Sequence, residues 1–146
     1  MSTSFQVFGD RVEAFNDLDL IALVYLASRR VASEPDRYLA FAPMLADWIL
    51  GIAVSGPGTI DLNLNNLIAP DTTRCELIAL LTRIGEELSQ FGDSVPASVL
   101  NKQQVAPNVK FHDYPVTLLS TALRALKSLL GAESNRDSQN RGIGAD

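Results

Sequence analysis

The chain has 146 residues, 47 % of them hydrophobic and 20 % charged, and its formal net charge at pH 7 is −5. These values predict a single folded domain over residues 1–146 and exclude long disorder and loose, charge-driven binding to nucleic acid. A local basic site stays compatible with an acidic whole, because only the electrostatic field at the site matters.

The number of cysteines and the length of the apolar runs exclude further classes of protein. The single cysteine, Cys75, excludes an internal disulfide and a zinc site made of several cysteines. The start MSTSFQVFGD has no basic stretch followed by an apolar run, so we expect no signal peptide. The longest apolar run, LIALVYLA, is too short to span a bilayer. We therefore expect a soluble, intracellular protein without a membrane partner.

The first half of the chain predicts one strand and two helices. Residues 4–8 alternate in the manner of a short strand or an extended arm. Residues 17–31 follow good cap residues and carry leucines at helical spacing, which predicts a helix. A second helix is expected over 34–50, with Ser33 as its cap. Pro43 falls in the middle of this helix, where a proline should kink or break it.

The second half predicts two further helices and a long loop. Residues 59–65 alternate strictly and predict a short strand or extended crossing. Apolar residues at three- and four-residue steps predict helices over 72–91 and 114–130. The polar stretch 92–112 between them contains two prolines and predicts a loop, of a length that is often functional. The tail 132–146 is polar and is expected to be mobile.

Four amphipathic helices with a small extended element predict an all-α fold. The expected architecture is a four-helix bundle with a short strand element. The long loop between the third and fourth helices would lie at one end of this bundle. We find no internal repeat and no second domain in the sequence.

The sequence offers no convincing catalytic or metal site. His112 is the only histidine, and its neighbour Asp113 points elsewhere because adjacent side chains on one chain point apart. No serine or cysteine is placed as a nucleophile, and no glycine-rich phosphate loop occurs. Glu86 and Glu87 are adjacent on a predicted helix and read most simply as a solvated face. We therefore expect no enzyme, no cofactor and no metal.

The basic residues allow two interpretations. Scattered surface charge is the simpler one. The other is a basic seat for an anion, formed by Arg29, Arg30, Arg37 and Arg83 or by Lys102 and Lys110 in the long loop. Ser33 and Arg37 share a predicted helix start, and Lys110 comes just before Asp113 at another. Backbone N–H groups at a helix start, together with an arginine, can bind phosphate.

The order of several short motifs resembles a known family. FQVF contains Phe5 and Phe8, FNDLDLIAL starts at Phe15, SEPDR contains Ser33 and Arg37, and ADW ends at Trp48. This order resembles the coat proteins of rod-shaped plant viruses, tobamoviruses in particular. Their sequences have a Phe-x-Phe arm, an aromatic start to the first helix, a Ser/Thr-x-x-x-Arg start to the second helix and a tryptophan at its end.

The resemblance continues along almost the whole chain. SGPGTIDLN, CELIALLTRI, KFHD and GAESNR follow in the order of comparable family segments. There is one departure. The family has an Asp-Thr-Arg-Asn-Arg element whose arginines contact phosphate, and this chain has GEELS at 85–89 instead. Arg83 lies one turn earlier and could compensate.

The resemblance implies a structural capsid protein that assembles into a helical rod around single-stranded RNA, in the virion and the host cytoplasm. Residue by residue, it implies RNA contacts at Ser33, Arg37, Arg83, Lys110, Asp113, Val116 and Ser120. It also implies contacts between subunits, including carboxylates that the sequence cannot pair, at Phe8, Phe15, Trp48, Asp47, Asp71, Glu86 and Glu87. Trp48 could equally be a core residue. The partners implied are RNA and further copies of the chain.

A second hypothesis fits the composition equally well. A small acidic α-helical binding module, such as an inhibitor or immunity-type protein, would have the same length, charge and helical content. Such a protein would stay monomeric where a coat protein polymerises. The sequence leaves both open.

Overall fold

The computed structural model describes residues 2–68, 70–102 and 109–131. In chain order the elements are β1 (Thr3–Phe8), β2 (Arg11–Asn16), α1 (Asp17–Ser33), the 3-10 helix η1 (Leu39–Phe41), α2 (Ala42–Val54), α3 (Leu64–Leu67), α4 (Asp71–Leu88), β3 (Ser94–Val95), α5 (Ala97–Asn101), β4 (Tyr114–Pro115) and α6 (Val116–Leu129).

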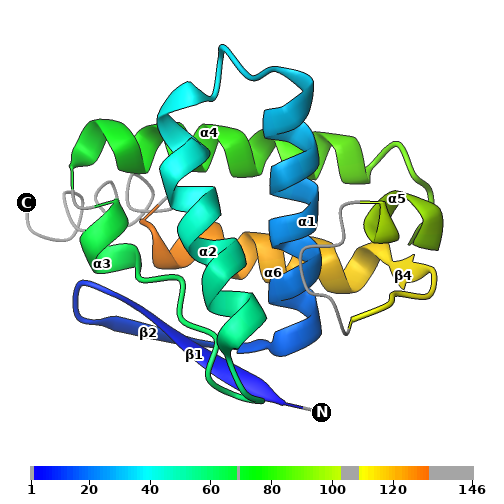
Figure 1. Cartoon of the computed structure of the whole chain (residues 1–146), viewed down its shortest axis with the longest axis horizontal. Coiled ribbons are helices and arrows are strands. Elements are labelled where there is room, and N and C mark those ends of the chain that lie inside the picture. The colour runs from blue at the N-terminus through cyan, green and yellow to red at the C-terminus, as the bar shows by residue number, and fades with distance from the viewer. Residues whose placement is uncertain (1, 69, 103–108, 132–146) are drawn as a thin grey trace, which may run out of the picture.

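The four longer helices form two pairs that cross (Figure 1). α1 lies beside α2, and α4 lies beside α6, while α1 also contacts both members of the other pair. The eight consecutive residues 20–27 of α1 are all buried. A helix that is apolar on every side belongs in the interior, so α1 is the centre of the core.

The expected all-α four-helix bundle is wrong. The described residues contain two antiparallel two-stranded sheets, β1–β2 and β3–β4, so the fold mixes helices and strands. The prediction was wrong because the fold class was inferred from the four amphipathic helices alone. Short strands that pair at the edge of a helical core were not counted.

The predicted second helix is also wrong in its first half. α1 continues to Ser33, so Ser33 ends a helix and does not cap one. The helix stops there because Glu34 precedes Pro35, and a residue before proline disfavours helical geometry. α2 starts only at Ala42, which places Pro43 in the first turn, where a missing N–H costs nothing. Pro43 therefore causes no kink.

Two other segments differ from their predictions. Of the two expectations for 59–65, a strand does not form: residues 59–63 cross without strand pairing, and at Asn63, with a left-handed φ of 54°, the chain turns into α3. The expected loop over 92–112 contains β3 and α5, and β3 pairs with β4 through Val95 and Tyr114. Residues 103–108 of that loop and the expected mobile tail, 132–146, lie outside the described residues.

The β1–β2 hairpin is attached through polar side chains. Ser4 and Gln6 are fully buried, each with 0 % exposure. The amide of Gln6 donates to the Ile60 carbonyl oxygen at 2.7 Å and accepts from the Leu62 N–H at 2.8 Å. The Ser4 hydroxyl donates to Asp17 and accepts from the Ile60 N–H. These side-chain bonds to the backbone of residues 60 and 62 attach the hairpin to that segment without strand-to-strand pairing.

The other side of the hairpin reaches the end of α6. Arg11 donates from Nη1 to the Ser128 carbonyl oxygen at 3.0 Å, and Arg74 of α4 donates to the Leu130 carbonyl oxygen at 2.9 Å. The last carbonyl groups of a helix lack partners within it and carry partial negative charge, so arginines there are favourable. α6 is therefore tied at its end to both the hairpin and α4.

Two aromatic residues expected at subunit contacts lie in the interior. Phe15 and Trp48 are 4 % and 3 % exposed. The Trp48 indole N–H donates to the Leu62 carbonyl oxygen at 2.7 Å, which holds α2 against the segment before α3. Both rings pack in the core of their own chain. No helix in the described part of the chain is long and apolar enough to cross a membrane.

Tyr114 of β4 and Asp19 of α1 form a pair that predicts a pH dependence. Tyr114 donates its hydroxyl to Asp19. Burial raises the pKa of Tyr114 above its ordinary value of 10, and the bond to Asp19 raises it further. Burial also raises the pKa of Asp19, although the tyrosine bond opposes this. Above pH 10 the unfolded tyrosine ionises before the folded one, so the free energy of unfolding should fall as the pH rises.

We expect Tyr114→Phe to lower the free energy of unfolding at pH 7 by about 1 kcal/mol, because Asp19 loses a donor. We also expect the variant to lose less stability than the wild type between about pH 9 and 11. Urea titrations across this range measure both effects. Tyr38→Phe is the control, and an alkaline loss that is unchanged in Tyr114→Phe would contradict the assignment.

Candidate functional site

Five charged side chains form a continuous row where the end of α1 meets the end of α4. In order along the row they are Arg29, Glu87, Arg30, Glu34 and Arg37. Glu87 accepts from Arg29 at 3.3 Å and from Arg30 through its other oxygen. Arg30 also donates to Glu34 at 3.1 Å, and Arg37 lies 3.8 Å from the second oxygen of Glu34. We call this row the arginine line.

Local sequence explains most of the row. Arg30 and Glu34 are one helical turn apart, a spacing that places the two side chains on the same face of α1. Arg30 lies in the last turn of α1, where a positive charge is favourable. Glu87 comes from the last turn of α4, 57 positions away from Arg30 in the sequence. Only the packing of α1 against α4 brings it there.

Both ends of the arginine line are arginines on aromatic rings. The guanidinium carbon of Arg29 lies 5.6 Å from the centre of the Phe91 ring, and that of Arg37 lies 5.6 Å from the Tyr38 ring. The side chains of these arginines are 41 % and 60 % exposed, respectively, whereas that of Arg30 in the middle is only 18 % exposed. Each end therefore presents a cation stacked on a ring to the solvent.

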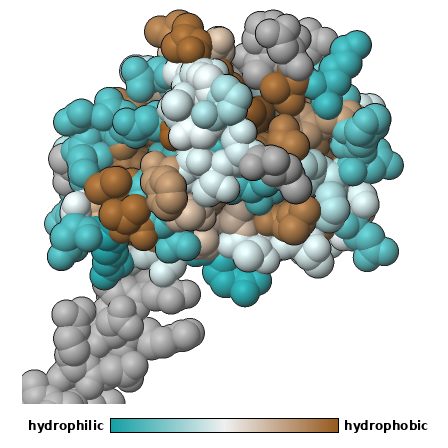
Figure 2. Space-filling model, turned by 90° about the horizontal axis from the view of Figure 1, so that it is seen from below, coloured by the Kyte–Doolittle hydropathy of each residue, from teal (hydrophilic) through white to brown (hydrophobic). Residues whose placement is uncertain are grey.

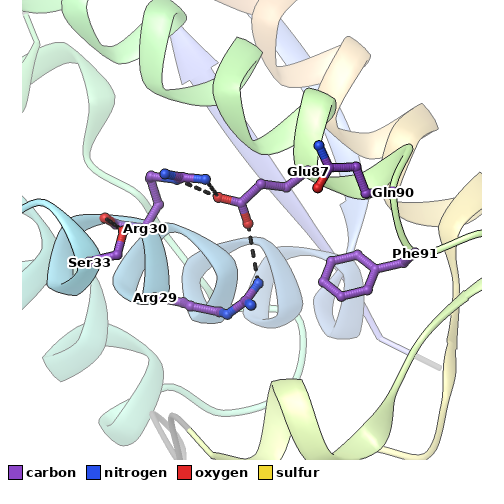
Figure 3. A pocket seen from close by; sticks show the side chains of 6 residues that line it. All are labelled: Arg29, Arg30, Ser33, Glu87, Gln90 and Phe91. Atoms are coloured by element: carbon purple, nitrogen blue, oxygen red, sulfur yellow. Dashed lines mark hydrogen bonds and ion pairs between the residues drawn. The ribbon is translucent and has the colours of Figure 1, made fainter.

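A cavity of about 370 Å³ opens at the Arg29 end (Figure 3). It is lined by Arg29, Arg30, Ser33, Glu87, Gln90 and Phe91. Figure 3 shows the Glu87 carboxylate held between the two guanidinium groups, with the Phe91 ring beside Arg29. The Ser33 hydroxyl donates to the Arg30 carbonyl oxygen at 2.7 Å, so it is turned toward its own helix.

The arginine line has a net positive charge. Three arginines face two glutamates, which leaves +1 over these five side chains, with the exposed Asp36 beside Arg37, in a chain whose formal net charge is −5. Burial alone would lower the pKa of Arg30, but its bonds and charge attraction to Glu87 and Glu34 outweigh burial and raise it. Arg30 therefore stays charged and fully paired. The exposed ends carry the charge that a ligand could use.

Two of the predicted RNA residues belong to this site and the others lie elsewhere. Ser33 lines the cavity and Arg37 ends the row. Arg83 pairs with Glu86 at 3.2 Å, on a part of α4 that does not line the cavity. The remaining residues do not line the cavity and belong to the region around β4 and the start of α6: Lys110, Asp113, Val116 and Ser120.

Asp113 does not begin the last helix as expected, because α6 starts at Val116. Its carboxylate accepts from the Ala97 N–H at 2.8 Å and so caps α5 from across the β3–β4 pair. This bond directs the carboxylate to α5 and not to the exposed His112 beside it. Within the described residues, no group of three or more histidine, cysteine, aspartate or glutamate side chains could hold a metal ion.

The carboxylates expected at subunit contacts fall into different environments. The Glu87 side chain is 14 % exposed and is bound inside its own chain, whereas that of its neighbour Glu86 is 59 % exposed. Asp47 is exposed, and the Asp71 side chain is 92 % exposed with only a 3.7 Å contact to Arg74. Phe8 is half-buried beside the core. The interpretation of Glu87 as a solvated face was wrong.

Sequence reasoning missed Glu34 and Phe91 as members of the site. The Arg30–Glu34 spacing was a signal for one half of the row. Nothing in the sequence links Phe91 to Arg29, because the two are brought together only by the tertiary fold. Comparison of the chain with protein-family models, curated proteins and solved structures finds no match.

Proposed function

We propose that the protein binds single-stranded RNA at the arginine line and acts as a structural coat subunit that assembles with further copies. The observation that carries the proposal is the pair of exposed arginines stacked on aromatic rings at the two ends of the row. Arginine and aromatic side chains together form the usual platform for single-stranded nucleic acid, where phosphates meet cations and bases stack on planar groups.

Arg29 is prepared for a phosphate. A guanidinium group has five N–H donors, and Arg29 donates from Nη1 to Glu87 while its side chain stays 41 % exposed. The bond to Glu87 on one side and the Phe91 ring on the other hold the group in one orientation. A cation that is already oriented loses less conformational entropy when it binds a phosphate.

The ring contacts favour a single strand over a duplex. Phe91 is half-buried and borders the cavity beside Arg29, so a splayed base can reach its ring or the guanidinium plane. A duplex keeps its bases stacked on one another and offers mainly its backbone to such a site. The local charge of only +1 implies weak binding per subunit, and many subunits along one strand would add their contributions.

The test is a fluorescence anisotropy titration of a short labelled RNA with the purified full chain at low salt. We expect Arg29→Ala and Arg37→Ala each to weaken binding about tenfold, because each removes a charge-assisted contact. Raised salt should weaken wild-type binding. A hairpin duplex of the same sequence should bind more weakly than the single strand.

Arg83→Ala is the matched control, because Arg83 is also an exposed arginine with a single glutamate partner. Arg83→Ala also removes one positive charge, but the charge lies on α4 outside the arginine line. RNA affinity should therefore stay within about twofold of the wild-type value. An equal loss in all three variants would mean that only net charge matters. That result, or a wild-type protein that binds no RNA at low salt, would reject the proposal.

One observation favours the second hypothesis, a protein-binding module. The hairpin exposes large apolar side chains, with Phe5 63 % and Val12 59 % exposed, and a partner protein could cover them. The RNA titration separates the two functions. A binding module that recognises only protein would show no difference between Arg29→Ala and Arg83→Ala.

A further inference from the structure

The polarity of the β1–β2 hairpin is reversed relative to an ordinary surface strand. A surface strand normally turns apolar residues inward and polar residues to the solvent. In β1, Ser4 and Gln6 are fully buried, whereas Phe5 and Val7 are 63 % and 43 % exposed. The buried polar groups have hydrogen-bond partners inside the chain. The exposed apolar groups gain nothing inside this chain to offset their exposure.

The exposed apolar side chains share one face. In the strand register Phe5 lies opposite Ala14, and Val7 lies opposite Val12. Alternate residues of a strand point to the same side, so these four side chains form two adjacent pairs on the outer face of the hairpin. We call this surface the hairpin face. Figure 2 views the side of the molecule on which Figure 1 places the hairpin, and it shows hydrophobic side chains at the surface among hydrophilic ones.

The two strands contribute no charged side chain to the hairpin face, and a nearby charge is Asp61, which lines a groove together with Phe5 and Val7. The remaining pair on this side is Thr3 opposite Asn16, both uncharged. The charged residues of β2, Arg11 and Glu13, occupy the alternate positions, opposite Phe8 and Gln6. Two copies of a chain with a net charge of −5 repel each other, and the repulsion is smallest where the facing surfaces are neutral. A nucleic acid would find no positive side chain among the strand residues of this face.

We infer that the hairpin face is the contact between two copies of this chain. The inference rests on the proposed coat function, which requires contacts between copies, but it does not depend on the arginine line. The two hairpins can pack face to face about a two-fold axis that lies between the copies. If this axis is parallel to the strands and midway between β1 and β2, β1 of one copy lies over β2 of the other. Phe5 then lies over the small Ala14 of the second copy, and Val7 lies over Val12.

This arrangement uses the shape of the face. The large Phe5 side chain of each copy packs on the small Ala14 of the other copy, so two identical faces are complementary in shape. The four side chains offer only on the order of a few hundred Å² of apolar surface, whereas stable dimers bury about 800 Å² per partner. We therefore expect weak association, with a Kd of about 10–100 μM.

The test is sedimentation velocity of the full chain from about 5 μM to 1 mM, a range that brackets this Kd. The wild type should pass from monomer to dimer. Val7→Glu and Val12→Glu change side chains that are already exposed in the single copy, so the fold should persist, as circular dichroism can verify. Each places a carboxylate against the second copy and should weaken association at least tenfold. Two variants on different strands guard against a local folding defect.

Leu39→Glu is the matched control. Leu39 is 71 % exposed and lies on η1, at a distance from the hairpin, so the variant adds the same charge and removes similar apolar surface. It should dimerise as the wild type does. A wild type that remains monomeric at 1 mM, or dimerisation that falls equally in all three variants, would overturn the inference. If RNA binding survives in either case, the arginine line stands and only the contact between copies fails.

Discussion

Gln6→Leu is expected to destabilise the protein by about 2–5 kcal/mol. The substitution keeps the size of a fully buried side chain but removes its donor and its acceptor. The Ile60 carbonyl oxygen and the Leu62 N–H then stay buried without partners. Each unpaired buried group costs about 1–3 kcal/mol, and the total is a large fraction of the stability of a small domain. Urea unfolding at pH 7 measures the loss.

Two further variants test the cause of this loss. Gln90→Leu changes an exposed glutamine in the same way and should shift the free energy of unfolding by less than about 0.5 kcal/mol. Gln6→Glu places a carboxylate against the Ile60 carbonyl oxygen, and only its protonated form can donate there. Its folded pKa should be raised, so its stability should recover as the pH falls toward about 4. If Gln6→Glu loses further stability on acidification relative to the wild type, the bonding scheme is incorrect.

The second large effect is expected at Glu87. Glu87→Gln removes the charge that neutralises two arginines at a side chain only 14 % exposed, and Arg30 keeps only Glu34 as an acidic partner. We expect a loss of about 2 kcal/mol in the free energy of unfolding. The local charge of the arginine line rises from +1 to +2, so RNA affinity should increase while stability falls.

Glu86→Gln is the control, because it changes the same residue type at the neighbouring position. Glu86 and Arg83 are 59 % and 44 % exposed, and such surface pairs contribute about 0–1 kcal/mol. Urea unfolding and the anisotropy titration should therefore separate the two glutamates in both stability and RNA affinity. Equal changes at both positions would show that Glu87 is not the centre of the site.

The sequence predicted the elements whose pattern is strong and local. The leucines of α1, α4 and α6 repeat at helical spacing over many residues, and the predicted ranges 17–31, 72–91 and 114–130 fall within a few residues of the observed helices. The strand at 4–8 was also predicted, because FQVF alternates. Local pattern sufficed for these elements since each one is long or regular enough to stand out.

The rest depended on contacts between distant residues. Alternation cannot tell which side of a strand faces inward, and apolar residues would be expected to face the core. Gln6 reversed this expectation, because residues 60 and 62 supply a donor and an acceptor for its amide. In the same way, Glu87 resembles Glu86 in the sequence and differs only because α1 packs beside it. Arg37 was identified with the wrong neighbours, since its partner is Glu34 and not a helix start.

The bonds that secure the hairpin have a consequence for the order of folding. Gln6 is 54 positions from Ile60, and Arg11 is 117 positions from Ser128. The hairpin precedes both of its anchors in the chain, since the first follows α2 and the second is the end of α6. Contacts between such distant residues form slowly, because a long stretch of chain must be ordered before they can be made. The hairpin is therefore fixed only after the segments that follow it in the chain have folded, and until then its apolar surface stays unprotected.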